Sequence, residues 1–371
     1  MAIILLINVF LKLLLLECLE QVCVSAEQKS TPGGASFPPD FGIPRSPIID
    51  FIDHPDTSVP DRFDVRDKWP KCGSLFDQIV DQGKCQMSWV PALLSTMSDR
   101  LCIQSNGTDI FQYSVEDLLT CCSTCFNAKP KDICQSGWIF RTIKYLYSKG
   151  CTSGENAESS NSGGCKSLSE QTRNGEPPEC QDKCTNPEYK TSDKRYCGRA
   201  TYLYNHPGII DTKQVQIEVM KNGPMTMFIN ATPSFMNYTD EIFDEETDEI
   251  LGRPNFMQAV RLFGWGNENG TPYWLMANTW GRNWGRMGGL FKIAMTENVL
   301  HVEEFALAPF PSKKASAKIR ERKRSARLLV ELAAAPSAQK MQSCIEVRDG
   351  LDDVTLSTGS NSPDPTTSLR P

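Results

Sequence analysis

The stretch Asp81-Gln82-Gly83-Lys84-Cys85-Gln86-Met87-Ser88-Trp89 decides the fold of this chain. It is a loop containing a glycine, and it runs into a one-sided helical pattern made by Trp89, Ala92, Leu93, Thr96, Met97 and Leu101. This spacing predicts a helix, with Ser88 at or near its N-terminus. Free N–H groups and the helix dipole favour negative charge there, so a nucleophile at position 88 would gain acidity. The residue present is a serine.

The same stretch resembles the nucleophile segment of papain-family cysteine peptidases, and most closely that of cathepsin B, which reads roughly D-Q-G-x-C-G-S-C-W. The resemblance runs from about Val59 to Ala308 and includes several further motifs in order: Asn222-Gly223-Pro224, Gly264-Trp265-Gly266, Asn278-Thr279-Trp280 and Asn283-Trp284-Gly285. It implies an α+β, two-lobed papain-like fold. One lobe would be helical and the other β-barrel-like, with a cleft between them.

The local patterns agree with this order of elements. Residues 60–190 are rich in helical patterns, which include a helix with a serine cap at Ser114 and a second one over 139–147. From about Tyr202 the residue pattern changes. A helical stretch is predicted over 215–220, and strand-like runs follow over 225–229, 259–264, 273–278 and 289–294. Helices are therefore expected first and the sheet second.

Composition points to an oxidising compartment. The chain has 371 residues, a net charge of −6 and a pI of about 5.3, which argue against a nucleic-acid partner. Its 15 cysteines are too many for an ordinary cytosolic protein. Residues 1–26, with an apolar run from Ile3 to Leu16, are predicted to be a secretory signal peptide. A membrane anchor is disfavoured because the run is short. We therefore predict a secreted protein, with a lysosomal or other endomembrane lumen as the alternative.

The predicted domain covers residues 59–311 and has extensions at both ends. Residues 27–58 are interpreted as a flexible arm, with a vestigial propeptide as the alternative. Residues 312–371, basic over 313–327 and then polar, are expected to be a disordered tail. An anionic surface contact or a processing site near 320–324 is the alternative reading of the tail.

The cysteine pattern suggests a disulfide-bonded frame. Resemblance to cathepsin B implies Cys72–Cys102, Cys85–Cys134, Cys121–Cys180, Cys122–Cys125 and Cys165–Cys184. Two cysteines, Cys151 and Cys197, are then left inside the domain, and we predict that they pair. Cys344 in the tail is the odd one.

The resemblance also assigns the reaction centre. Ser88 takes the place of the nucleophilic cysteine, and Gln258 that of the histidine base. Gln82 takes the place of the oxyanion-hole glutamine, and Asn278 and Trp280 match the amide that orients the base and its aromatic neighbour. A serine needs a base to remove its proton, and a glutamine amide does not accept one near neutral pH. We therefore predict an inactive homologue, with weak hydrolysis through Ser88 as the alternative.

Other features weaken the expected peptidase. Gln135 and Ser136 interrupt the backbone ledge that pairs with substrate, and the shortened loop from Cys165 to Cys184 lacks the histidines that give cathepsin B its dipeptidase activity. The chain's only histidines, His54, His206 and His301, have no motif context, so no metal or other cofactor is expected. Glycosylation sequons occur at Asn106, Asn230, Asn237 and Asn269.

These observations lead to a hypothesis of binding. The predicted ligand is a peptide or protein segment in the cleft. An inhibitor of active cathepsins, such as a cystatin-like wedge, is another possible occupant. The chain also resembles the tubulointerstitial nephritis antigen group, in which a serine likewise occupies the nucleophile position. That group is tied to the extracellular matrix, which suggests a matrix partner. The cysteine-rich N-terminal module of that group is missing from this chain.

Overall fold

The structure, a computed structural model, describes residues 48–126, 133–134, 137–155, 163–191, 193–205, 208–245, 256–296 and 298–313. The chain divides into two compact units, residues 1–316 and 317–371, and everything described lies in the first. The predicted signal peptide, most of the predicted tail, Cys344 and His206 lie outside the described residues. Among the residues that are described, no helix is long and apolar enough to cross a membrane.

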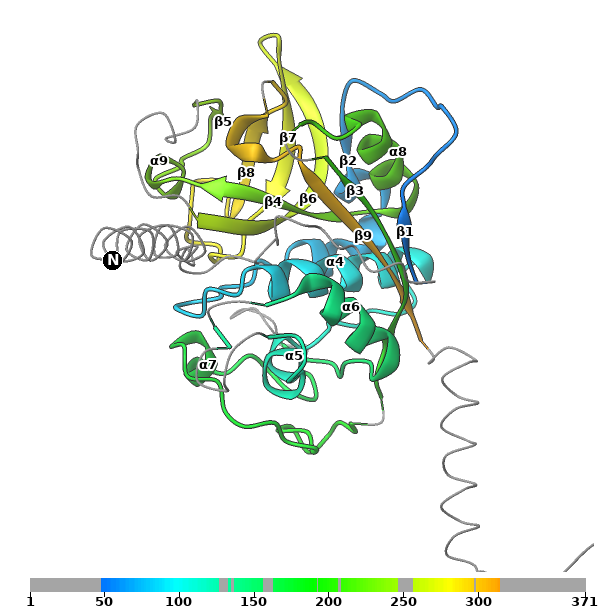
Figure 1. The fold of residues 1–371 in the computed structure, drawn as a ribbon, viewed down its shortest axis with the longest axis vertical. Helices are drawn as coiled ribbons and strands as arrows, with labels where there is room; N and C mark the ends of the chain where they lie inside the picture. Colours follow the sequence, from blue (N-terminus) through cyan, green and yellow to red (C-terminus); the bar gives the residue numbers. More distant parts are fainter. Residues whose placement is uncertain are drawn as a thin grey trace, which may run out of the picture. The chain divides into compact units, whose positions relative to one another are not determined.

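One sheet forms the upper lobe and continues down the side of the molecule (Figure 1). Its strands follow the order β1-β3-β9-β4-β6-β7-β8-β5, and β2 pairs with β6 off this path. The bounds are β1 Ile49–Phe51, β2 Phe63–Asp64, β3 Tyr196–Tyr204, β4 Met225–Ala231, β5 Ile242–Phe243, β6 Phe256–Glu268, β7 Thr271–Ala277, β8 Leu290–Ala294 and β9 Phe305–Ser312. The path has two ends, so the described strands make an open sheet rather than the barrel-like lobe that was expected. The short edge strands β1 and β5 each pair with a single neighbour.

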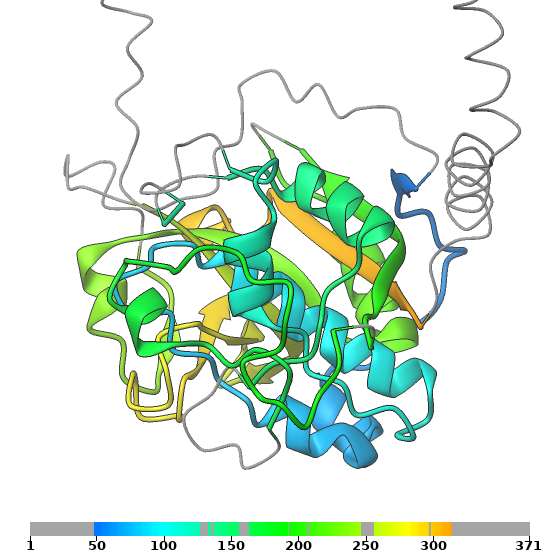
Figure 2. The same cartoon turned by 90° about the horizontal axis from the view of Figure 1, so that it is seen from below.

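The helical lobe is built around α4 (Trp89–Gln104). The other helices are α2 Val65–Lys68, α3 Gly73–Phe76, α5 Val115–Cys121, α6 Ile139–Ser148, α7 Glu170–Arg173, α8 Thr212–Asn222 and α9 Pro233–Met236, with 3₁₀ turns η1 Pro70–Cys72 and η4 Val299–His301. As predicted, α5 begins after Ser114, whose hydroxyl accepts from the N–H of Asp117 at 2.9 Å. Seen from below, α6 lies along β3 and β9 (Figure 2), and α6 contacts β3 while α4 contacts β9.

Buried ion pairs tie α4 to the sheet side of the molecule. Arg100 Nη1 lies 2.8 Å from Glu218 Oε1 on α8, and Arg261 Nη1 on β6 lies 2.9 Å from Asp99 Oδ2. Burial raises the pKa of Asp99 to about 6 although Arg261 opposes this rise. Burial also disfavours the charge on Glu218, but Arg100, His54 and Asn222 together hold its pKa below the ordinary value. Each buried charge has a partner, as burial requires.

The residues just before the predicted domain are not a free arm. β1 pairs in parallel with β3, and Ile49 and Ile52 are buried. The backbone N–H of His54 donates to Gln214 Oε1 at 2.7 Å, and its ring Nε2 lies 2.6 Å from Glu218 Oε2. Residues 48–54 therefore belong to the folded unit, because pairing with β3 and burial of two isoleucines hold them in place.

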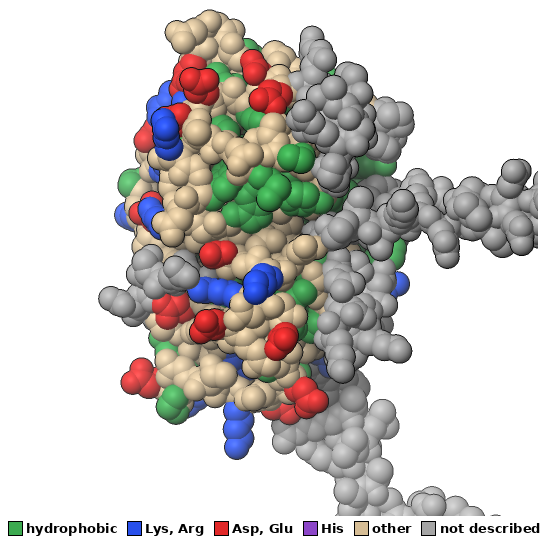
Figure 3. All heavy atoms as spheres, turned by 90° about the vertical axis from the view of Figure 1, so that its left-hand side faces the viewer, with side chains coloured by type: hydrophobic (Ala, Val, Ile, Leu, Met, Phe, Trp, Pro, Cys, Tyr) green, Lys and Arg blue, Asp and Glu red, His purple; other side chains and the backbone are tan. Residues whose placement is uncertain are grey.

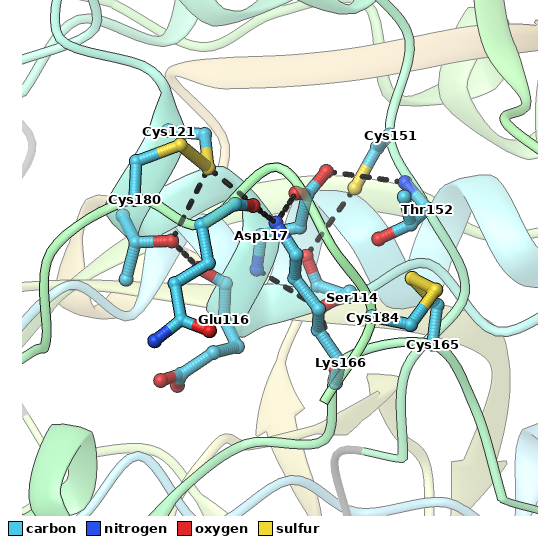
Figure 4. A network of polar contacts seen from close by, with 12 residues as sticks. Ser114, Glu116, Asp117, Cys121, Cys151, Thr152, Cys165, Lys166, Cys180 and Cys184 are labelled. Atoms are coloured by element: carbon cyan, nitrogen blue, oxygen red, sulfur yellow. Dashed lines mark hydrogen bonds and ion pairs between the residues drawn. A yellow bond between two sulfur atoms is a disulfide. The ribbon is translucent and has the colours of Figure 1, made fainter. Parts of the chain in front are cut away.

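Five disulfides are present at the positions that the resemblance implied: Cys72–Cys102, Cys85–Cys134, Cys121–Cys180, Cys122–Cys125 and Cys165–Cys184. They fit an oxidising compartment, such as the secreted or lysosomal space that cathepsin-like proteins occupy. Figure 4 shows two of them beside Lys166, whose Nζ lies 2.6 Å from Asp117 Oδ1 and 3.6 Å from Cys121 Sγ.

The predicted Cys151–Cys197 bond is not formed. Both cysteines are buried and free. The thiol of Cys151 donates to the carbonyl of Ser114 at 3.3 Å (Figure 4), and that of Cys197 donates to the carbonyl of Arg199 at 3.2 Å. Burial raises the pKa of Cys151 well above its usual range and that of Cys197 to about 12. The pairing was inferred by elimination, and elimination says nothing about how far apart two thiols lie.

Candidate functional site

Ser88 stands at the start of α4, as the sequence predicted. Its side chain is fully buried and does not cap its own helix. The hydroxyl oxygen instead accepts from the backbone N–H of Ala259 on β6 at 2.9 Å. The Ser88 hydroxyl is therefore fixed between α4 and β6.

Gln258 lies inside β6, not before it, because the strand begins at Phe256. Its Nε2 donates to Asn278 Oδ1 and to Thr279 Oγ1, each at 2.8 Å. A longer contact of 3.5 Å joins it to Gln82 Oε1. The structure thus brings Gln258, Asn278 and Gln82 together from three distant segments, as the resemblance implied.

The loop that carries Gln82 is held against the segment after β7. The N–H of Gln82 donates to the carbonyl of Thr279 at 2.9 Å, and Asp81 forms an isolated bridge with Trp280. Gly83 has a φ of +60°, and a Cβ on it would lie 2.4 Å from the carbonyl oxygen of Arg173. The glycine is required at this point because the loop turns tightly against a neighbouring chain segment.

Thr279 is the residue of this site whose role the sequence did not reveal. Its hydroxyl donates to Gln82 Oε1 and accepts from Gln258 Nε2, so it links the two glutamines. The only hint in the sequence was that Thr279, a residue with a hydroxyl, directly follows Asn278 in the motif Asn278-Thr279-Trp280. Ser88, Gln82, Gln258, Asn278 and Thr279 are referred to below as the polar frame.

The polar frame offers amide donors and two hydroxyls, those of Ser88 and Thr279. The Nδ2 of Asn278 is buried, and no partner for it exists among the described residues. Amide groups such as these polarise a carbonyl but take up no proton near neutral pH. A hydrolytic step at Ser88 would therefore pass its proton to water rather than to a side chain of the frame.

The other expected features fall elsewhere. His54 pairs with Glu218 on α8, and His301 Nδ1 lies 2.7 Å from Glu304 Oε1. No group of side chains suited to a metal ion is found within the described part of the chain. Gln135 and Ser136 lie outside it. Of the sequon asparagines, Asn106, Asn237 and Asn269 are exposed, and Asn230 is half-buried on β4.

This fold and this polar frame define a papain-type protein. A sequence profile described as "Papain family cysteine protease" matches residues 59–310, and the chain belongs to this family. It is similar to the cathepsin B-like cysteine proteinases 4 and 5 of Caenorhabditis elegans. The first is 32% identical over 292 residues, covering 73% of this chain and 82% of that protein. The second is 34% identical over 273 residues, covering 68% and 75%. It is also similar to the solved structure of "proCathepsin B S9 from Trypanosoma congolense", with a TM-score of 0.61, 25% identity, and coverage of 76% and 87%.

These comparisons correct one prediction. We predicted that the chain is not an enzyme, but the relatives are named cysteine proteinases, so peptidase activity is the expectation that the family sets. The prediction rested on the residue types at positions 88 and 258. Two substituted positions do not by themselves exclude chemistry by a hydroxyl held at a helix N-terminus.

Proposed function

We propose that this protein binds an extended peptide, or an exposed segment of another protein, in the cleft beside Ser88. The observation that carries this proposal is the polar frame, in which Gln258 donates to both Asn278 and Thr279. Side-chain amides such as those of Gln82 and Asn278 are suited to the carbonyl groups of a peptide. Trp280, directly after the frame, supplies an apolar surface for a ligand side chain.

A second candidate function is hydrolysis of that peptide with Ser88 as nucleophile. The printed names of the relatives favour it. In this reaction the Ser88 oxygen would attack the peptide carbonyl, and water would take the hydroxyl proton. The peptide C–N bond would then break, the departing amine would receive a proton from water, and an acyl ester would remain on Ser88. A second water would hydrolyse this ester, which releases the carboxylic acid and regenerates the Ser88 hydroxyl. Gln82, which supports the frame through Thr279, would face the developing oxyanion.

One experiment addresses both candidates. Purified full-length protein is titrated with fluorescein-labelled peptide pools, and the same mixtures are followed by mass spectrometry for cleavage. Binding is expected to weaken at least about tenfold in Trp280→Ala, a loss of the size found when a central aromatic is truncated. It should be unchanged in Arg62→Ala, whose ion pair with Asp67 is exposed. Equal binding by both variants would count against the cleft.

Cleavage is judged separately from binding. Products that disappear in Ser88→Ala while binding persists would support hydrolysis at Ser88. Products that persist in Ser88→Ala would assign the cleavage to another residue or to a contaminant, and would remove the second candidate.

The remaining partner hypotheses concern the same cleft or the compartment. A cystatin-like inhibitor in the cleft should bind at micromolar concentration or tighter and compete with the labelled peptides; absence of such competition ends that idea. The likeness to the tubulointerstitial nephritis antigen group suggests an extracellular-matrix partner. Retention of the protein on immobilised matrix protein would test this suggestion. A glycosidase-sensitive mass, and a mature N-terminus near residue 27, would support the proposed glycans and signal peptide.

A further inference from the structure

A buried ammonium group lies beside one of the disulfides. The Lys166 side chain is 5% exposed, and its Nζ lies 3.6 Å from Cys121 Sγ in the Cys121–Cys180 bond (Figure 4). The same Nζ lies 2.6 Å from Asp117 Oδ1 and also donates to the carbonyl of Gln181. The three N–H groups of the ammonium therefore have three acceptors, and one of these acceptors is a disulfide sulfur.

Hydrogen bonds to the backbone hold this ammonium in place. The Ser114 hydroxyl donates to the carbonyl of Lys166 at 2.6 Å, and the N–H of Lys166 donates to the carbonyl of Ser153 at 3.0 Å. Asp117 is held in turn, since its Oδ2 accepts from the N–H of Thr152 at 3.2 Å. The positive charge is thus positioned beside the disulfide before any reaction takes place.

The two sulfurs of this disulfide have different surroundings. Of the cysteines that lie in the described ranges, Cys180 alone is exposed; Cys121 and Cys184 are half-buried, and the others are buried. Figure 3 shows the side of the molecule that carries α7, where charged side chains of both signs are spread over the lower lobe. A water-soluble reagent can therefore reach the bond at Cys180, whereas Lys166 lies at the other sulfur.

This asymmetry matters for thiol–disulfide exchange. When a thiolate attacks one sulfur of a disulfide, the other sulfur leaves with the electron pair of the broken bond. A disulfide sulfur is a weak acceptor, but a thiolate is an anion, so the contact between Lys166 and Cys121 strengthens as the bond breaks. Asp117 shares the ammonium and offsets part of this gain, because its carboxylate repels the new thiolate.

We propose that the Cys121–Cys180 bond is a site of modification by small aliphatic thiols, such as glutathione or cysteine. The thiol gives its proton to water, and its sulfur forms a bond to Cys180 Sγ. The bond between the two cysteines breaks, its electron pair stays on Cys121 beside Lys166, and that thiolate then takes a proton from water. One disulfide replaces another, so the reaction consumes no oxidant and no reductant other than the thiol. This inference is independent of the proposed function.

The exchange releases a chain segment that adjoins the polar frame. Cys121 ends α5, and Cys180 belongs to the segment that follows α7. The last residue of α7, Arg173, accepts through its carbonyl from the N–H of Lys84, two residues after Gln82. Modification at Cys180 therefore removes the tie between α5 and a segment that begins beside the loop of the frame.

The test follows the exchange in the folded full-length protein. Thiols that are already free are blocked with iodoacetamide, the protein is incubated with reduced glutathione, and new thiols are trapped at intervals with N-ethylmaleimide. Peptide mass spectrometry then locates both groups. Glutathione should appear first on Cys180 and maleimide first on Cys121. The Cys165–Cys184 bond, which has no exposed sulfur, should react at least about tenfold more slowly.

Variants at Lys166 separate its charge from its effect on folding. Lys166→Gln should lower the exchange rate at Cys121–Cys180 about tenfold, because the departing sulfur loses its cation. A loosened fold would raise this rate, so a fall in rate is not a folding defect. Lys166→Gln combined with Asp117→Asn leaves no buried charge unpaired and should also lower the rate, by a smaller factor. Lys166→Arg keeps a cation and should retain most of the rate.

Lys183→Gln is the matched control, because Lys183 is an exposed lysine in the same loop. It should change the rate less than about twofold. Equal falls in Lys166→Gln and Lys183→Gln would overturn the proposal, since the effect would then come from general attraction of the anionic reagent. First addition of glutathione at another cysteine, or a rate that stays level or rises in both the single Lys166→Gln variant and its combination with Asp117→Asn, would also overturn it.

Discussion

The polar frame and the ties around α4 are both networks of buried polar side chains, but they differ in what their residues do. In the frame, Gln258 and Gln82 are uncharged and bond mainly to other side chains. Around α4, Arg100 and Glu218 are charged, and Arg100 also donates to the backbone carbonyls of Gly223 and Pro224. The second network holds chain segments together through charge, whereas the first joins uncharged side chains from the Gln82 loop, β6 and the segment after β7. Exchanges in the frame should therefore change chemistry or binding, and exchanges around α4 should change stability.

The largest effect is expected from placing in the frame the cysteine and histidine that the resemblance assigns to positions 88 and 258. Ser88→Cys combined with Gln258→His should raise the rate of peptide hydrolysis by about 10²–10⁴-fold, because an imidazole accepts a proton near neutral pH and an amide does not. The measurement is the initial rate on fluorogenic dipeptide substrates, with labelling by an epoxide reagent as a second readout.

Each single variant is the control for that double exchange. Ser88→Cys alone should gain reagent labelling with a smaller gain in rate, since it lacks the base. If the double variant unfolds at the wild-type temperature and yet gains nothing, the frame does not hold the geometry that hydrolysis needs.

The next largest effect lies in the other network. Arg100→Leu should lower the free energy of unfolding by about 3–5 kcal/mol, because it leaves the Glu218 carboxylate buried without its cation. Chemical denaturation followed by tryptophan fluorescence measures this loss. Arg62→Ala breaks an exposed pair and should cost less than about 1 kcal/mol. A loss of similar size in both variants would contradict the assignment of the α4 ties to stability.

A third effect compares bonded with free cysteines. Replacing Cys121 and Cys180 by alanine removes a crosslink with a sequence separation of 59 and should cost about 2–4 kcal/mol. Cys151→Ala removes a buried thiol that closes no loop and should cost about 1 kcal/mol. If Cys151→Ala costs as much as the double replacement, or if thiol titration of the unfolded protein finds Cys151 and Cys197 oxidised, the two cysteines pair after all.

Much of this organisation was readable from the sequence wherever a residue pattern was local. The helix after Ser88 and the helix after Ser114 follow from spacing and capping, and both are present. The strands β4, β6, β7 and β8 appear where apolar runs predicted them, although β6 begins at Phe256 and so includes Gln258. Boundaries moved because pairing with β4 extends the strand beyond its apolar run.

Pairing between distant segments was not readable in the same way. β9, Phe305–Ser312, contains two prolines and gives no alternating signal, and β1 is only three residues long. Both are strands because β3 offers them a partner. The site shows the same limit, since the bridging role of the Thr279 hydroxyl depends on two glutamines that lie far away in sequence.

The smallest expected effect concerns pH and again belongs to the ties around α4. Because the pKa of Glu218 in the folded protein lies below its ordinary value of 4.5, the unfolded chain binds this proton more readily. The stability that the ionised carboxylate contributes is therefore fully present above pH 4.5 and is lost as the pH falls through the folded-state pKa. Glu218→Gln should flatten the fall in unfolding free energy on acidification between about pH 5 and about pH 3. His54→Gln distinguishes the contribution of Glu218 from that of His54, because the glutamine can still hydrogen-bond to Glu218 but does not titrate. The slope should persist in His54→Gln, and its loss there would assign the acid limb to the imidazole.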